Sequence, residues 1–113
     1  MCPASNPIDW NVARQLTGGD ETLLADLVAM FPQQSQKQLD EMRSGIAAAD
    51  GARLERGAHS LKSSARLFGA NDLAAVALEL EHSGRDADFT HAQTRLDALE
   101  RELDRVVTAV QNR

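Results

Sequence analysis

Residues 89–110 read FTHAQTRLDALERELDRVVTAV, and this stretch carries the most regular hydrophobic pattern in the chain. Its apolar side chains recur at alternating steps of three and four residues: Phe89, Ala92, Leu96, Leu99, Leu103, Val106 and Val110. Steps of this size place apolar residues along one face of a helix and leave polar residues on the other. The stretch therefore predicts a long amphipathic helix that must bury its apolar face against other helices.

Two segments in the middle of the chain show the same helical pattern. The one nearer this stretch begins at Asn71, an expected N-cap, and should end at Gly84. The other should end at Gly69, and its apolar seam follows steps of four and three residues: Leu54, Ala58, Leu61, Ala65 and Phe68. Both segments are predicted to be helices of a bundle.

Two more helices are predicted nearer the N-terminus. A short one begins after the N-cap Asp9 and ends at Gly18-Gly19. A long one begins after the N-cap Asp20 and is expected to close at Asp50-Gly51. Pro32 lies inside the long segment, where it removes a backbone donor and clashes with the preceding turn. The helix must therefore bend or restart at this proline, and we favour a bend.

Together these segments predict an all-α fold: an antiparallel up-down-up-down four-helix bundle with a short additional N-terminal helix. The chain has 113 residues, enough for one buried core and too few for two ordinary domains. We assign residues 1–7 to a flexible N-terminal tail and residues 8–113 to the bundle. A coiled coil is the alternative, but seven glycines divide the chain into pieces of bundle size.

The composition argues against several classes of protein. Seventeen Asp and Glu against twelve Lys and Arg give a net charge of -5, which disfavours a general nucleic-acid binder or direct contact with an anionic membrane. No apolar run approaches the roughly 20 residues of a membrane span. Cys2 is the only cysteine, so no intramolecular disulfide can form, and the cytoplasm fits best.

Metal and nucleotide sites find no support in the sequence. His82 and His91 have no partners at metal-ligand spacing, so we read them as surface histidines. No glycine-rich phosphate loop follows a strand, so we expect no ATP site and no intrinsic cofactor.

The outward face of the helix around residues 54–68 carries a histidine. At about 100° per residue, His59 lies about 140° from the centre of the apolar seam, Ser63 about 180° and Lys62 about 80°. Between residues 53 and 66, four Arg and Lys residues stand against one Glu, a local charge of +3 in an acidic chain. The wheel therefore predicts an exposed imidazole on a basic face.

Such an arrangement suits attack on a phosphoryl group, because imidazole titrates near pH 6.5 and keeps a free lone pair at cell pH. A small residue at position 63 leaves the approach open, and a cation at position 62 can meet phosphoryl oxygens. The alternative is that His59 is an ordinary surface histidine.

The local sequence resembles a known signature. Residues 58–70, AHSLKSSARLFGA, are similar to histidine-containing phosphotransfer domains, in which the phosphorylated histidine precedes Leu-Lys, a small residue and a later Gly-Ala pair. Three further stretches resemble the family in order and spacing: residues 8–10 (IDW), 18–24 (GGDETLL) and 78–81 (LELE). The resemblance covers nearly the whole chain.

The resemblance implies that His59 accepts a phosphoryl group on Nε2 from an aspartate of a receiver domain and passes it to another receiver. Lys62 would be the family's lysine that offsets phosphoryl charge, and Ser63 stands where many members have glycine. Glu81 stands where many members carry a glutamine near the histidine. Its carboxylate would bond Nδ1–H and fix the tautomer, unless Glu81 is an ordinary solvated glutamate.

The resemblance also implies partners. Arg56 and Arg66, with Leu67 and Leu78, which fall out of phase with the apolar seams, are expected to form the surface that contacts response-regulator receivers. Single exposed leucines are also common, which is the alternative for both. We expect a monomeric phosphocarrier rather than an enzyme, with Mg²⁺ held by the receiver. The chain either stands alone or belongs to a hybrid sensor histidine kinase.

Two other functions compete with this interpretation. A helical adaptor would use surface contacts alone, but the His-Leu-Lys core is intact. In the phosphoacceptor domain of a histidine kinase, the histidine is usually followed by an acidic residue and then Leu-Arg-Thr-Pro, whereas Ser60-Leu61-Lys62-Ser63 follows here.

Overall fold

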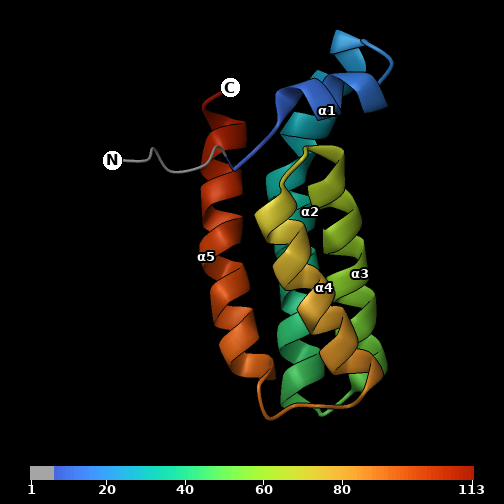
Figure 1. The fold of residues 1–113 in the computed structure, drawn as a ribbon, viewed down its shortest axis with the longest axis vertical. Coiled ribbons are helices and arrows are strands. Elements are labelled where there is room, and N and C mark those ends of the chain that lie inside the picture. The colour runs from blue at the N-terminus through green and yellow to red at the C-terminus, as the bar shows by residue number, and fades with distance from the viewer. Residues whose placement is uncertain (1–6) are drawn as a thin grey trace.

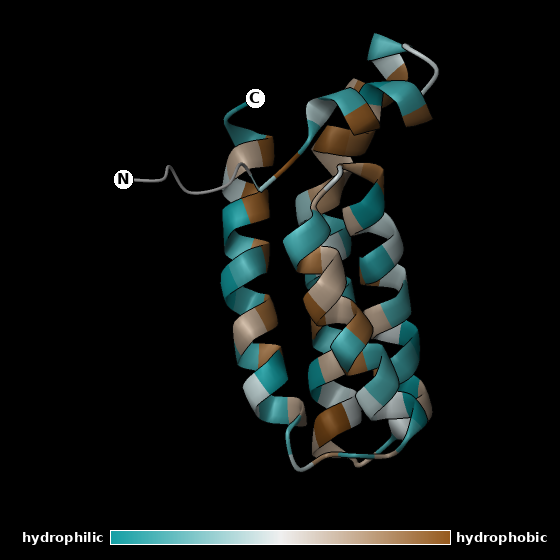
Figure 2. Ribbon diagram, viewed as in Figure 1, coloured by the Kyte–Doolittle hydropathy of each residue, from teal (hydrophilic) through white to brown (hydrophobic). Residues whose placement is uncertain are grey.

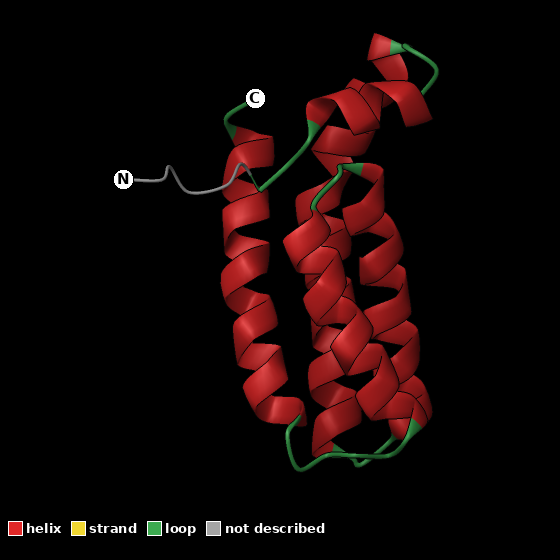
Figure 3. Cartoon of the chain, viewed as in Figure 1, coloured by secondary structure: helices red, strands yellow, loops and turns green. Residues whose placement is uncertain are grey.

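The computed structural model describes residues 7–113, which form five helices joined by short turns (Figure 1). The helices are α1 (Trp10–Leu16), α2 (Glu21–Ala47), α3 (Gly51–Leu67), α4 (Asn71–Arg85) and α5 (Ala92–Gln111). Helices α2 to α5 form the antiparallel bundle, and α1 lies at one end of it (Figure 1). No strand occurs between residues 7 and 113, as Figure 3 shows, so the predicted all-α fold is confirmed. The proposed tail and Cys2 lie, apart from Pro7, outside the described residues.

Each helix of the bundle packs against two neighbours. Helix α3 lies between α2 and α4, and α5 closes the ring by packing against α4 and α2. Hydrophobic and hydrophilic stretches alternate along every helix (Figure 2), as an amphipathic pattern requires. The seam predicted for α5 is buried from Ala92 to Val110, whereas Phe89 precedes the helix and packs against the core only in part.

Aspartates begin three of the helices by accepting a hydrogen bond from a backbone N–H of the first turn. Asp9 accepts from Asn11 in α1, and Asp20 accepts from Leu23 in α2, as predicted. The expectation that Asp50 closes α2 is wrong, because Asp50 accepts from the backbone N–H of Arg53 and so begins α3. The expected cap at Asn71 is also wrong: Ala70 is the N-cap of α4, without a side-chain hydrogen bond.

The helix ends show a second difference from the sequence pattern. Gly69 ends α3 in a left-handed conformation (φ 63°), as predicted. The corresponding residues after α2 and α4 are alanines: Ala49 and Ala87 both have φ 52°. Gly51 and Gly84, which the sequence suggested as stop signals, instead lie within α3 and α4. Helix α2 runs unbroken through Pro32, which rules out a restart there.

Gly51 and Gly84 bring the backbones of α3 and α4 into direct contact. A Cβ atom built on Gly84 would lie 2.6 Å from the carbonyl oxygen of Gly51 and 2.6 Å from the backbone nitrogen of Glu55. A Cβ on Gly51 would collide with the carbonyl oxygen of Gly84. These distances are too short for any side chain, so both glycines are required for the close approach of the two helices.

An aromatic cluster fixes α1 to the end of the bundle. The rings of Trp10 and Phe31 both meet Phe68 edge-on, at centroid distances of 6.0 and 5.2 Å. The guanidinium of Arg113 lies 5.2 Å from the Trp10 ring centroid and bonds Glu21 at 2.9 Å. The cluster thus joins α1, α2 and the ends of α3 and α5.

The close approach of α3 and α4 predicts the effect of adding one methyl group. Gly84→Ala should lower the free energy of unfolding by about 1–3 kcal/mol, because the new Cβ meets backbone that must shift. Helix propensity alone would favour alanine by about 1 kcal/mol. Chemical denaturation measures the effect, and Ala75→Gly, at an exposed position of α4, calibrates the propensity term. A G84A variant as stable as the wild type would show that the contact is loose.

Candidate functional site

His59 lies near the middle of α3 and points to solvent. Its side chain is 60% exposed, whereas the α3 seam residues Leu54, Ala58, Leu61 and Ala65 are fully buried. The outward direction predicted from the helical wheel is therefore confirmed. A partner protein in solution can reach the ring without any movement of the bundle.

Glu81, from α4, holds one side of the His59 ring. Its Oε2 lies 3.1 Å from Nδ1 of His59, and its side chain is only 9% exposed. The alternative that Glu81 is an ordinary solvated glutamate is therefore ruled out. Because an ionised carboxylate only accepts hydrogen bonds, Nδ1 must carry the proton in this contact. The neutral ring then has its lone pair on Nε2.

Lys62 approaches the same carboxylate from α3. Its Nζ lies 2.5 Å from Oε1 of Glu81, and the residue is only 8% exposed. Lys62 sits three residues after His59, so both side chains reach α4 from neighbouring turns of one helix. Each oxygen of the carboxylate thus has its own partner on α3: Oε1 has Lys62 and Oε2 has His59.

These contacts determine the charge of the buried carboxyl group. Burial alone would raise the pKa of Glu81, but hydrogen bonds from Lys62 and His59, together with their charges, outweigh burial and lower the pKa below 4.5. Glu81 is therefore ionised at neutral pH. The ionised form supports the assignment of the proton to Nδ1 of His59.

Arg85 extends the cluster toward solvent, and the sequence analysis did not single it out. Its Nη2 lies 3.9 Å from Oε2 of Glu81, and its Nε lies 3.5 Å from Oε2 of Glu55, one turn before His59 on α3. The side chain is 55% exposed. The i, i+4 spacing of Glu81 and Arg85 is the signal that would have identified the pair.

Ser63 leaves the outer side of His59 uncovered. The residue is exposed, and its hydroxyl donates to the backbone oxygen of His59 at 3.1 Å. This hydrogen bond holds the side chain against its own helix. The side chain at position 63 is therefore small, and its hydrogen bond to the backbone keeps it from covering the exposed ring.

The four residues expected to contact a partner differ in exposure. Arg56 and Arg66 are exposed on α3, and neither makes an ion pair with another residue in the described part of the chain. Leu67 and Leu78 are half-buried rather than outside, and Leu67 packs against the core. Their neighbours on adjacent helices cover part of each leucine, which a single-helix wheel does not register. The large apolar side chains that are exposed lie on α1 and α2 instead: Leu16, Leu23 and Met30.

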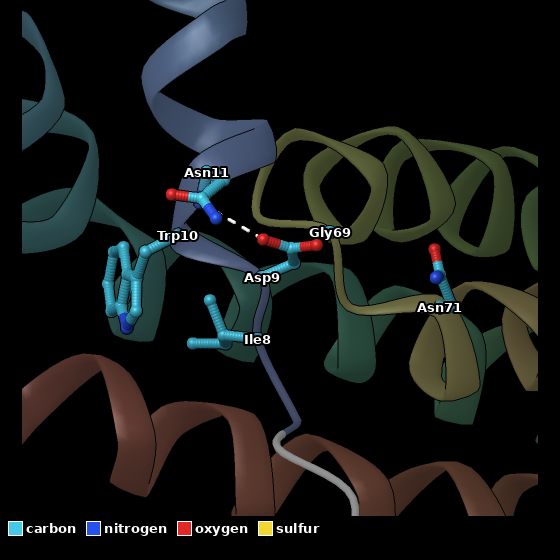
Figure 4. Close-up of a pocket in the computed structure, with 6 residues that line it drawn as sticks. All are labelled: Ile8, Asp9, Trp10, Asn11, Gly69 and Asn71. Carbon is cyan, nitrogen blue, oxygen red and sulfur yellow. Dashed lines mark hydrogen bonds between the residues drawn. The ribbon is translucent and has the colours of Figure 1, made fainter.

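Two surface hollows lie near these elements. One lies between α2 and α3, beside the histidine face, and is lined by Lys37, Gln38, Glu41, Arg56, Gly57 and Ser60. Figure 4 shows the other, at the α1 end, where Asp9 accepts from the backbone of Asn11 next to Trp10 and Gly69. No histidine lines the second hollow, so it offers no counterpart of His59.

His82 and His91 are exposed, and between residues 7 and 113 no three His, Cys, Asp or Glu side chains gather as a metal site. None of the helices in that range has the length and apolar character needed to cross a bilayer.

The fold and this cluster define a histidine phosphotransfer domain, and comparison with known proteins supports that class. The sequence model of the Hpt domain family matches residues 26–109, and the chain belongs to this family. Among solved structures, the histidine-containing phosphotransfer protein B (HptB) from Pseudomonas aeruginosa PAO1 is similar to the chain. It is 27% identical, with a TM-score of 0.88 over 96% of this chain and 95% of that one. No curated protein sequence matches significantly. The family match favours phosphotransfer over an adaptor or a kinase dimerisation domain.

The lowered pKa of Glu81 predicts how stability depends on pH. A carboxyl whose pKa falls on folding contributes stability above its unfolded pKa and loses it as pH falls through the folded value. Glu81→Gln should therefore be less stable than the wild type by about 3 kcal/mol at pH 7, since it breaks a buried ion pair. The difference should stay constant down to about pH 5 and shrink below pH 4.5.

Denaturant titrations between pH 3 and pH 7 measure this difference. Glu79→Gln is the matched control, since Glu79 is an exposed glutamate on the same helix that forms no ion pair with the rest of residues 7–113. It should stay within about 0.5 kcal/mol of the wild type throughout. A pH-independent loss in E81Q would refute the assigned charge of Glu81.

Proposed function

We propose that His59 is the phosphoacceptor of this domain, which performs histidine phosphotransfer in a phosphorelay. His59 takes a phosphoryl group from the aspartyl phosphate of one receiver domain and gives it to the aspartate of another. The observation that carries this proposal is the contact between Nδ1 of His59 and the buried Glu81, which leaves Nε2 as the nucleophile on an exposed ring. Ordinary surface histidines have no such fixed tautomer.

The transfer balances without an added acid or base. The Nε2 lone pair attacks phosphorus, the bond from phosphorus to the aspartyl oxygen breaks, and the carboxylate leaves with the electron pair. Nδ1 keeps its proton, so the phosphorylated ring carries positive charge facing the carboxylate of Glu81. In the second transfer a receiver carboxylate attacks phosphorus, and the N–P electron pair returns to Nε2.

The exposed cations around His59 suit an anionic partner. Arg56 and Arg66 lie on the same helix as His59, and Arg85 lies on α4 beside Glu81. Their positive charges would attract the phosphorylated receiver. They would also offset the negative charge of the phosphoryl oxygens while the group is bound to Nε2. Leu67 and Leu78, although half-buried, would contribute the apolar part of the contact.

The domain is a phosphocarrier rather than a kinase. We infer that it has no ATP site and depends on the receiver for Mg²⁺, which would polarise the phosphoryl oxygens during transfer. We also propose that it works as a monomer in the cytoplasm, on its own or as part of a hybrid sensor kinase.

Labelling with a phosphorylated receiver tests the acceptor. The wild type should gain acid-labile, base-stable phosphate, as expected of an N–P bond, and His59→Gln should gain none. His82→Gln removes an exposed histidine from α4 and should label like the wild type. Label that persists in H59Q would move the acceptor to another residue.

Access to His59 should depend on the size of residue 63. Ser63→Trp should slow transfer from the receiver by about a hundredfold, because a bulky side chain displaces the donor from in-line geometry. Thr94→Trp places the same side chain at an exposed position of α5, which does not pack against α3, and should transfer normally. Circular dichroism should show both variants folded, and unchanged transfer in S63W would place the docking surface elsewhere.

A further inference from the structure

We propose that Lys62 is a positioning residue: it holds Glu81 against His59 and does not itself bind the phosphoryl group. This inference rests on the proposed role of His59 and departs from the expectation that Lys62 offsets phosphoryl charge. It assigns charge compensation at Nε2 to the exposed arginines instead.

The contacts of Lys62 support this assignment. Its ammonium lies 2.5 Å from Oε1 of Glu81, and only 10% of its side chain is exposed, against 60% for His59. Oε2 of the same carboxylate faces Nδ1 of His59. Lys62 therefore binds the carboxylate oxygen that faces away from the ring. This contact fixes the orientation of the carboxylate, so that Oε2 is the oxygen that faces Nδ1 of His59.

Moving Lys62 to the phosphoryl group would leave Glu81 without its main counterion. Glu81 is 9% exposed, and an ionised carboxylate at such a position is strongly unfavourable without its partner. The protonated alternative would remove the negative charge that stabilises the phosphorylated ring. If Lys62 left Glu81, the contact between Glu81 and Nδ1 of His59 would therefore be weakened, and the reactivity of Nε2 depends on that contact.

Other cations can meet the phosphoryl oxygens at less cost. The Arg85 side chain is 55% exposed and only 3.9 Å from the Glu81 oxygen that faces His59. Arg56 and Arg66 are exposed on α3 and make no ion pair with any of residues 7–113. These side chains can turn toward the phosphorylated ring while the buried pair stays intact.

A double-mutant cycle with a small phosphodonor separates the two roles of Lys62. Phosphoramidate, as the probe, transfers a phosphoryl group to histidine with loss of ammonia, and needs no docking surface. Lys62→Met should slow labelling of His59 by about tenfold, as expected for the loss of a residue that orients a reacting group. In the Glu81→Gln background, the same change should alter the rate by less than about twofold.

The controls address folding and identity. Lys37→Met changes the only other lysine, which is exposed on α2, and should label at the wild-type rate. The K62M/E81Q variant removes both charges and should fold even if either single variant is unstable. Equal slowing by K62M in both backgrounds would overturn the proposal and assign Lys62 to the phosphoryl group. A wild type that gives no phosphohistidine at position 59 would instead overturn the proposed function.

Nitrogen NMR on the wild-type protein provides a measurement that a purely structural role of Lys62 would not affect. The imidazole nitrogen shifts should show the proton on Nδ1, and K62M should increase the fraction with the proton on Nε2. The Lys62 ammonium signal should stay in place when phosphoramidate phosphorylates His59. A large shift of that signal, with a contact to phosphorus, would show that Lys62 leaves Glu81 and would contradict the proposal.

Discussion

The functional geometry depends on the contact between the backbones of α3 and α4 at Gly51 and Gly84, where no side chain fits. Because the two helices touch there, the side chain of Glu81 on α4 reaches across to α3 with both of its oxygens. A pair of helices held apart by ordinary side chains would leave this carboxylate in water, where it would neither orient His59 nor pair with Lys62. The orientation of the His59 ring thus depends on helix packing three residues beyond Glu81 on α4 and about two turns before His59 on α3.

The site combines a buried ion pair with an exposed nucleophile. Burying Glu81 and Lys62 carries a desolvation cost that their attraction need not repay, so the pair is a poor source of stability as such. What it provides is order: one carboxylate in one orientation, facing one ring nitrogen. The charged groups beyond it, chiefly Arg56, Arg66 and Arg85, remain in solvent, where long side chains can follow a partner's charge. The buried pair of Glu81 and Lys62 selects the ring nitrogen that reacts, and the exposed arginines are available to contact the phosphoryl group at that nitrogen.

Hydrophobic periodicity was sufficient to predict the bundle and the outward direction of His59, because both follow from the position of each Cβ around a helix axis. It was not sufficient for Lys62, whose long side chain starts at the edge of α3 and can end in solvent or in the interface with α4. Only the position of Glu81 decides between these outcomes, and that position depends on contacts between helices. The same applies to Leu67 and Leu78, which neighbouring helices cover in part. The predicted helix ends at Gly51 and Gly84 were wrong, because the sequence does not distinguish a glycine that permits close helix packing from one that ends a helix.

The connections that follow α2 and α4 lie at the end of the bundle opposite α1 (Figure 1). They contain the left-handed residues Ala49 and Ala87, and Ala87 lies close to Gly51. A left-handed alanine carries a steric penalty of about 1–2 kcal/mol that glycine avoids, partly offset by the greater freedom of glycine in the unfolded chain. Replacing either alanine with glycine would remove this penalty in the folded chain without changing a residue that contacts His59. Because Ala87 lies against Gly51, a change at this turn leaves phosphoryl transfer unaffected only where the contact between α3 and α4 is kept.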